Sequence, residues 1–175
     1  TSTSYPGYSV KEVINENPNT NHGPAIVSQN LTINENNSTP AFDPSSRLPD
    51  ANNMKMVALK GNVTVNGSNT NNKVDVYAIV NTVNLSSFTS SKVSFWTEQR
   101  YSNGTGAAFT VNISENYGGL TGDDWTNTTW TDVTSQVVGT IATQGQNAQQ
   151  WVRGEIDLSA YTANVTLAFR LVADS

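Results

Sequence analysis

The chain has 175 residues, a length that suits one domain with its own hydrophobic core. It contains no cysteine, which excludes a disulfide framework, a thiolate zinc site and a cysteine nucleophile. The net charge is −5 with only nine lysines and arginines, so neither nucleic acid nor an anionic membrane is an expected partner.

Uncharged polar residues dominate the composition. Charged residues make up only 13% of the chain, while it holds 23 Asn, 22 Thr and 18 Ser. Such a neutral polar surface is common in secreted β-proteins, and we expect a secreted or cell-surface location. No apolar run approaches 18 residues, so no membrane span is predicted.

The first 53 residues differ from the rest. All six prolines precede residue 50, and the segments 15–24 and 34–53 are rich in Asn and Pro. Within a single domain, 1–175, we therefore expect 1–53 to form an irregular arm or loop region. The segment 9–17 is the only weak helix candidate, and its pattern fits a strand equally well.

Short β-branched and aromatic runs follow, separated by Gly, Asn, Ser and Asp. This pattern predicts an all-β sandwich. In the run 92–99, Val93 and Phe95 share one face, while Trp96 lies on the other and is either a core residue or a flat binding platform. The predicted strands are 25–33, 54–61, 75–83, 92–99, 107–114, 129–135, 151–158 and 165–172.

Asn-x-Ser/Thr sequons are dense. They indicate either a glycosylated surface chain or simply the frequent meeting of Asn and Thr in turns and strands. The candidate positions are Asn30, Asn36, Asn37, Asn62, Asn66, Asn84, Asn103, Asn112, Asn127 and Asn164.

Several short motifs occur in a recognisable order from about residue 54 onward. They are the turns Asn84-Leu85-Ser86 and Asp157-Leu158-Ser159, the SFW run at 94–96, ISENY at 113–117 and TW at 129–130. Together they resemble the choice-of-anchor J and cleaved-adhesin group of bacterial surface domains, which includes gingipain adhesin domains. The resemblance implies a jelly-roll-like antiparallel β-sandwich, without catalysis, that acts in adhesion or glycan binding. Members of that group end in a further strand beyond the point where this chain stops.

The stretch 118–134 holds the strongest candidate binding residues. An exposed Trp125 beside Asp123 and Asp124 would suit a sugar, because a ring face stacks on C–H groups while polar side chains fix hydroxyls. The alternative is that Trp125 folds back and caps the core. The two aspartates are also possible calcium ligands, or they belong to a solvated turn. The full set of glycan-binding candidates is Trp125, Asp123, Asp124, Tyr101, Arg100 and Asn127.

Catalysis is not expected from the residue types. The single histidine, His22, lies in an Asn-rich loop without a Gly-x-Ser-x-Gly partner. Glu98, Glu115 and Glu155 are candidates for glycoside hydrolysis by type alone. We therefore expect no enzyme.

Two functions remain from the sequence. The first is a non-catalytic extracellular surface module that binds a polysaccharide or cell-surface glycan. The second is a structural subunit of an extracellular filament or matrix, in which the N-terminal arm donates a β-strand to the sandwich of an identical neighbour. The Pro/Asn-rich arm and the missing family strand motivate the second, and a chain that is a piece of a longer protein would explain the missing strand equally well.

Overall fold

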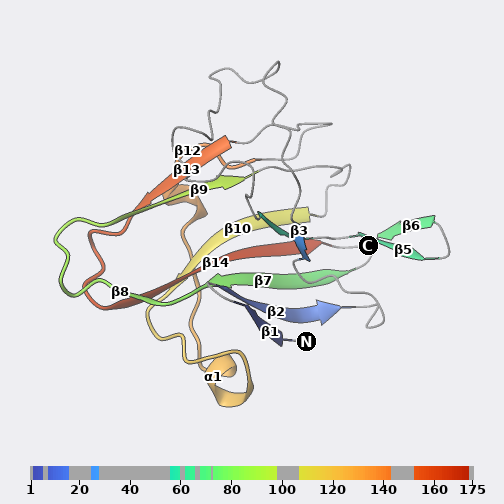
Figure 1. The fold of residues 1–175 in the computed structure, drawn as a ribbon, viewed down its shortest axis with the longest axis horizontal. Coiled ribbons are helices and arrows are strands. Elements are labelled where there is room, and N and C mark those ends of the chain that lie inside the picture. The colour runs from blue at the N-terminus through green and yellow to red at the C-terminus, as the bar shows by residue number, and fades with distance from the viewer. Residues whose placement is uncertain are drawn as a thin grey trace.

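A computed structural model shows the fold of the chain (Figure 1). The residues that it describes are 2–5, 8–15, 25–27, 56–59, 62–65, 68–71, 73–97, 107–142 and 152–173.

The larger sheet is antiparallel and is built around the last strand of the chain. Strand β14 (Asn164–Ala173) pairs with β7 (Val74–Val80) on one side and β10 (Ala107–Ser114) on the other. Its first two residues also pair with β8 (Val83–Asn84). Figure 1 shows β14 between β7 and β10, so the last strand is a central one.

Three further strands extend this sheet. β2 (Tyr8–Asn15) pairs with β7, and β1 (Ser2–Tyr5) pairs with β2 as a hairpin. At the opposite edge, the two-residue strand β11 (Thr131–Asp132) pairs with β10. The order is therefore β1-β2-β7-β14-β10-β11, with β8 attached to β14.

The smaller sheet has the order β12-β13-β9. Its strands are β12 (Val138–Gly139), β13 (Val152–Asp157) and β9 (Lys92–Thr97). Two separate ribbons complete the described strands, and the described helices are short. The ribbons are β3 (Ala25–Val27) with β4 (Met56–Ala58) and β5 (Asn62–Val65) with β6 (Ser68–Asn71); the helices are α1 (Gly122–Thr126) and the 3-10 turn η4 (Thr134–Gln136).

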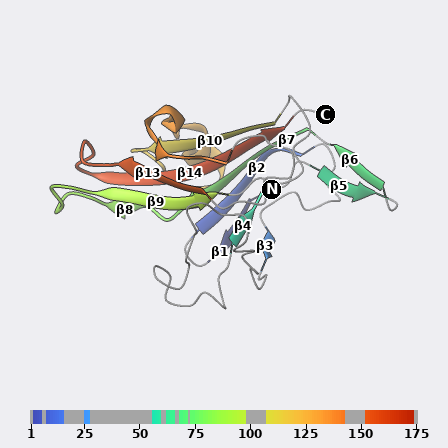
Figure 2. The same ribbon diagram turned by 90° about the horizontal axis from the view of Figure 1, so that it is seen from above.

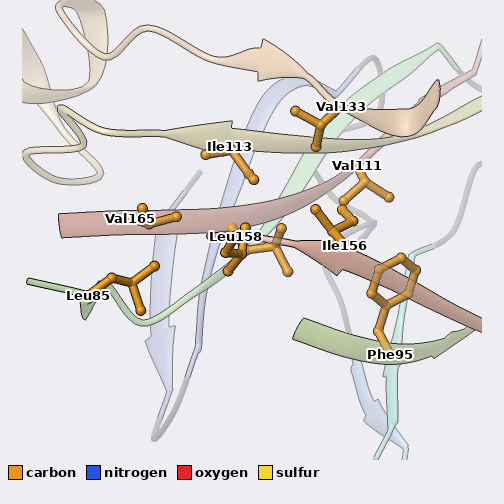
Figure 3. Close-up of a cluster of buried hydrophobic side chains, with 9 residues drawn as sticks. Leu85, Phe95, Val111, Ile113, Val133, Ile156, Leu158 and Val165 are labelled. Atoms are coloured by element: carbon orange, nitrogen blue, oxygen red, sulfur yellow. The ribbon is translucent and has the colours of Figure 1, made fainter. Parts of the chain in front are cut away.

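The main core lies between the two sheets. Strand alternation sends every second side chain of β9, β10, β13 and β14 into it. Figure 3 shows these side chains converging from both sheets. The fully or nearly buried members are Leu85, Phe95, Val111, Ile113, Val133, Ile156, Leu158, Val165 and Leu167.

A second apolar cluster covers the opposite face of the larger sheet. Tyr77 and Ile79 of β7 and Ala168 of β14 are buried there beneath the segment that follows β10. In Figure 2, α1 and β9 lie on opposite sides of β10 and β14. The covering side chains, which are partly buried, are Tyr117, Leu120, Trp125 and Trp130.

The predicted all-β sandwich is confirmed, and most predicted strands are present within a few residues of their expected bounds. Two expectations are wrong. Residues 2–5 and 8–15 are strands rather than part of an irregular arm, because the β2 backbone pairs along β7. The stretch 129–135 contains only β11 and η4. Among the described residues, no helix is long and apolar enough to cross a membrane.

Candidate functional site

Trp125 folds back onto the larger sheet instead of projecting from its loop. Its ring meets the ring of Tyr77 edge to face, with centroids 5.2 Å apart, and lies 6.2 Å from the ring of Trp130. The Nζ of Lys11 stands 5.2 Å from the Trp125 ring centre and donates a 2.7 Å hydrogen bond to the carbonyl of Leu120. Of the two interpretations of Trp125, the structure therefore shows the cap over the apolar cluster.

The neighbouring polar candidates belong to α1. Asp123 and Asp124 are exposed in its first turn, where carboxylates interact favourably with the positive end of the helix. Asn127 is exposed at the helix C-terminus, and its N–H bonds to the carbonyl of Asp123 at 2.8 Å. Within the described ranges, no group of three or more acidic, histidine or cysteine side chains could hold a metal ion. A calcium site at these aspartates thus stays a prediction.

The second pair of glycan candidates, Tyr101 and Arg100, lies outside the described residues, as do His22 and Glu98.

The sequons differ sharply in accessibility. Asn84, Asn127 and Asn164 are exposed, and Asn84 lies directly opposite Asn164 in the β8–β14 ladder. Asn112 is only 4% exposed and donates a 2.9 Å hydrogen bond to Thr110 Oγ1. In the folded chain the side chain of Asn112 is therefore covered, which disfavours glycosylation at this position. The remaining candidates, Asn30, Asn36, Asn37, Asn66 and Asn103 and the side chain of Asn62, lie outside the described part.

The face of the three-stranded sheet that points away from the core carries polar residues and one tryptophan. In the β9–β13 ladder, three residues of each strand stand opposite one another on the side away from the core. The neighbours Phe95, Gly154 and Ile156 are buried. The outward pairs, which we call the β9–β13 face, are Trp96 with Arg153, Ser94 with Glu155 and Lys92 with Asp157.

Hydrogen bonds fix the polar side chains of the β9–β13 face. Arg153 Nη2 donates to Ser94 Oγ at 2.6 Å and to Glu155 Oε2 at 2.7 Å. Lys92 Nζ donates to Glu155 Oε1 at 2.9 Å, and the Ser94 hydroxyl lies 3.2 Å from Glu155 Oε2. One carboxylate therefore bonds to two cations and a hydroxyl, and Arg153 lies opposite the half-buried Trp96 in the ladder.

The hydrogen-bonded ion pair of Glu155 with Lys92 keeps both groups ionised over a wide pH range. The Lys92 ammonium, and after it the Arg153 guanidinium, hold the pKa of Glu155 below its ordinary value of 4.5. The same carboxylate raises the pKa of Lys92 above 10.5. Because solvent screens exposed ion pairs, the network adds little to stability. Its main consequence is a surface whose donors and acceptors are already oriented.

The alternation of apolar and polar residues along the two strands partly predicted this face. Trp96 was placed opposite Phe95 correctly, and Glu155 was considered only by residue type. The period of two in Arg153-x-Glu155-x-Asp157 indicates one exposed strand face, but the sequence does not reveal that β9 lies beside it.

A scan against protein-family models gives no match, and a search of curated proteins finds no similar chain.

Replacing Trp125 tests its structural role. We expect Trp125→Ala to lower the free energy of unfolding by about 2–3 kcal/mol, because it uncovers Tyr77 and removes the Lys11 contact. Urea unfolding followed by circular dichroism measures the change. Phe88→Ala is the matched control, since Phe88 is 60% exposed and its loss should stay within about 0.5 kcal/mol. Equal effects of both changes would contradict the packing described for Trp125.

The electrostatics of Glu155 can be titrated directly. Carbon-13 NMR of its carboxyl should report a pKa below 4.5, with Lys92→Met raising it more than Arg153→Met does. Since the folded pKa is lowered, the contribution of the network to stability is present above pH 4.5 and is lost as the pH falls through the folded value. A Glu155 pKa that neither substitution moves would mean that the ion pairs do not persist in solution.

Proposed function

We propose that the protein is a non-catalytic extracellular surface module that binds a glycan through the β9–β13 face. The observation that carries this proposal is the oriented network of Arg153, Glu155 and Ser94 beside the ring of Trp96. Sugar recognition needs hydrogen-bonding groups at fixed positions next to an aromatic surface that packs against C–H groups. Groups that are already held in place lose little conformational freedom on binding.

The charge balance of the face favours a neutral, hydroxyl-rich ligand. Its two cations, Lys92 and Arg153, are matched by its two carboxylates, Glu155 and Asp157. Such a face offers both donors and acceptors without the excess positive charge that a polyanion requires. We therefore propose a neutral polysaccharide or cell-surface glycan as the ligand class.

The state of Glu155 argues against a general-acid role for it. A general acid for glycoside cleavage must hold its proton near neutral pH, which requires a raised pKa. Glu155 instead has a lowered pKa and bonds to Lys92 and Arg153. A carboxylate that is ionised at neutral pH suits the acceptance of hydrogen bonds from sugar hydroxyls.

The composition and the motif resemblance agree with this proposal. A chain rich in Asn, Thr and Ser with 13% charged residues fits a secreted or cell-surface protein. The exposed sequons at Asn84, Asn127 and Asn164 are compatible with that location. The similarity of the motif order to choice-of-anchor J and cleaved-adhesin domains supports adhesion as the biological role.

Binding to a broad glycan array, followed by calorimetry on the hits, tests the proposal. Arg153→Ala and Trp96→Ala should each weaken binding by about tenfold or more, because each removes a polar anchor or the stacking surface. Folded Trp125→Ala protein should bind with an affinity within about twofold of the wild-type value. Loss of binding in Trp125→Ala with retention in Arg153→Ala would move the site to the α1 loop. An array without any hit would overturn the glycan-binding function.

A filament subunit is a second candidate, and the N-terminal hairpin favours it. β1 and β2 lie at an edge of the larger sheet and pair only with each other and with β7 in the described strand order. A hairpin at this position can be exchanged into the sheet of a neighbouring copy without new contacts. Polymers of the natural protein in light scattering and electron microscopy would support this function. A monomer in dilute solution with the hairpin paired internally would contradict it.

A further inference from the structure

Four sequons have described side chains at both of their defining positions. N-linked glycosylation attaches a sugar to the Asn amide and also requires the hydroxyl of the Ser or Thr two residues later. A sequon in a folded chain therefore accepts a sugar best where both side chains reach solvent. The four are Asn84-Leu85-Ser86, Asn112-Ile113-Ser114, Asn127-Thr128-Thr129 and Asn164-Val165-Thr166.

The sequon in β10 is closed at both positions. Asn112 and Ser114 are 4% and 2% exposed. The Ser114 hydroxyl donates a 3.0 Å hydrogen bond to Asn116 Oδ1 and accepts one from the backbone N–H of Asn116 at 3.2 Å. A sugar on Asn112 would have to displace the groups that bury its amide, so the folded chain disfavours it.

The sequon at the start of β14 is closed at its hydroxyl. Asn164 is exposed, but Thr166 is only 1% exposed. Thr166 Oγ1 lies 2.6 Å from Thr82 Oγ1, in a hydrogen bond between the two hydroxyls. The second group that this sequon needs is therefore engaged inside the fold.

Asn84 is open, and it stands directly opposite Asn164. Asn84 and Ser86 are both exposed. Asn84 Oδ1 accepts a 2.9 Å hydrogen bond from the Ser86 backbone N–H, and this bond does not use the side-chain nitrogen that takes the sugar. Opposite residues of an antiparallel pair share one face with Cβ atoms about 4.5–5.5 Å apart, so a sugar on either Asn obstructs the other. The buried Thr166 hydroxyl decides the choice in favour of Asn84.

Asn127 is open too, and the backbone of its sequon is held by one side chain. Asn127 and Thr129 are exposed. Asn116 Nδ2 donates a 2.9 Å hydrogen bond to the carbonyl of Asn127, and Asn116 Oδ1 accepts one from the backbone N–H of Thr129 at 2.9 Å. Because these bonds use only the backbone of the sequon, its shape is fixed without engaging the amide or the hydroxyl that glycosylation requires.

We propose that Asn84 and Asn127 carry N-linked glycans in the natural protein and that Asn112 and Asn164 do not. The assignment rests on the proposed extracellular location and needs no glycan-binding site. Asn127 follows α1, and α1 and β9 lie on opposite sides of β10 and β14 (Figure 2). A sugar at Asn127 is therefore attached on the side away from the β9–β13 face, where it adds polar bulk beside the partly buried aromatic side chains around α1.

Mass spectrometry of the protein isolated from its natural source tests the assignment. Electron-transfer fragmentation of its peptides locates an added sugar on a particular Asn. We expect added sugar at Asn84 and Asn127 and unmodified side chains at Asn112 and Asn164. Absence of sugar at either of the first two positions, or a sugar at either of the other two, would overturn the proposal.

Two neighbouring threonines give a matched pair of variants for expression in the natural host. Thr129→Ala removes the sequon hydroxyl and keeps the backbone N–H that bonds to Asn116, so the sugar at Asn127 should be lost. Thr128→Ala changes only the middle residue of the sequon and should keep the sugar. Retention of the sugar in Thr129→Ala, or its loss from folded Thr128→Ala, would contradict the assignment.

The two proposals fail separately, because neither threonine belongs to the β9–β13 face. A glycan array without hits would overturn the binding function and leave the assignment of sugars standing. A natural protein without sugars would overturn the assignment alone.

Discussion

The central position of β14 is the constraint on which the rest of the described structure depends. Between β7 and β10, this strand is paired on both edges, and its residues from Val165 to Ala168 are buried on both faces. A strand covered on both faces requires a layer above and a layer below it. The three-stranded sheet supplies one layer, and the segment around α1 supplies the other. On the face covered by the α1 segment, Arg170 of β14 donates from Nε and Nη2 to the two carboxylate oxygens of Asp75 of β7, each at 2.8 Å.

This arrangement decides which aromatic side chains are available to a ligand. Trp125 and Trp130 complete the second layer, and their rings pack with Tyr77, over which the Arg170 guanidinium also lies at 5.1 Å. The three-stranded sheet has its apolar side against the core, and Lys92, Ser94 and Asp157 are exposed on its other side. The ordered Arg153–Glu155 network stands on that side. The α1 segment therefore packs against the larger sheet, and the β9–β13 face is the one we propose for recognition.

Local alternation was sufficient to predict the strands and the inward side chains of β9 and β14, because a period of two depends only on neighbouring residues. It could not predict the direction of Trp125, which is set by Tyr77 and Lys11 on strands distant in sequence. The N-terminal hairpin was assigned to an irregular arm because of the Asn- and Pro-rich composition around it, although the pattern of 9–17 also fitted a strand. Pairing of β2 with β7, distant in sequence, decides for the strand. Alternation placed Trp96 away from the core side of β9, but it could not show the whole candidate face, since that face needs β9 beside β13.

The most direct test of this division of roles is an NMR titration of the four tryptophan indole N–H signals with a panel of soluble neutral polysaccharides. We predict that the Trp96 signal shifts together with the amides of Ser94 and Arg153, while the Trp125 and Trp130 signals stay in place. A shift of Trp125 with an unchanged Trp96 would contradict the account and would make the α1 segment the binding surface.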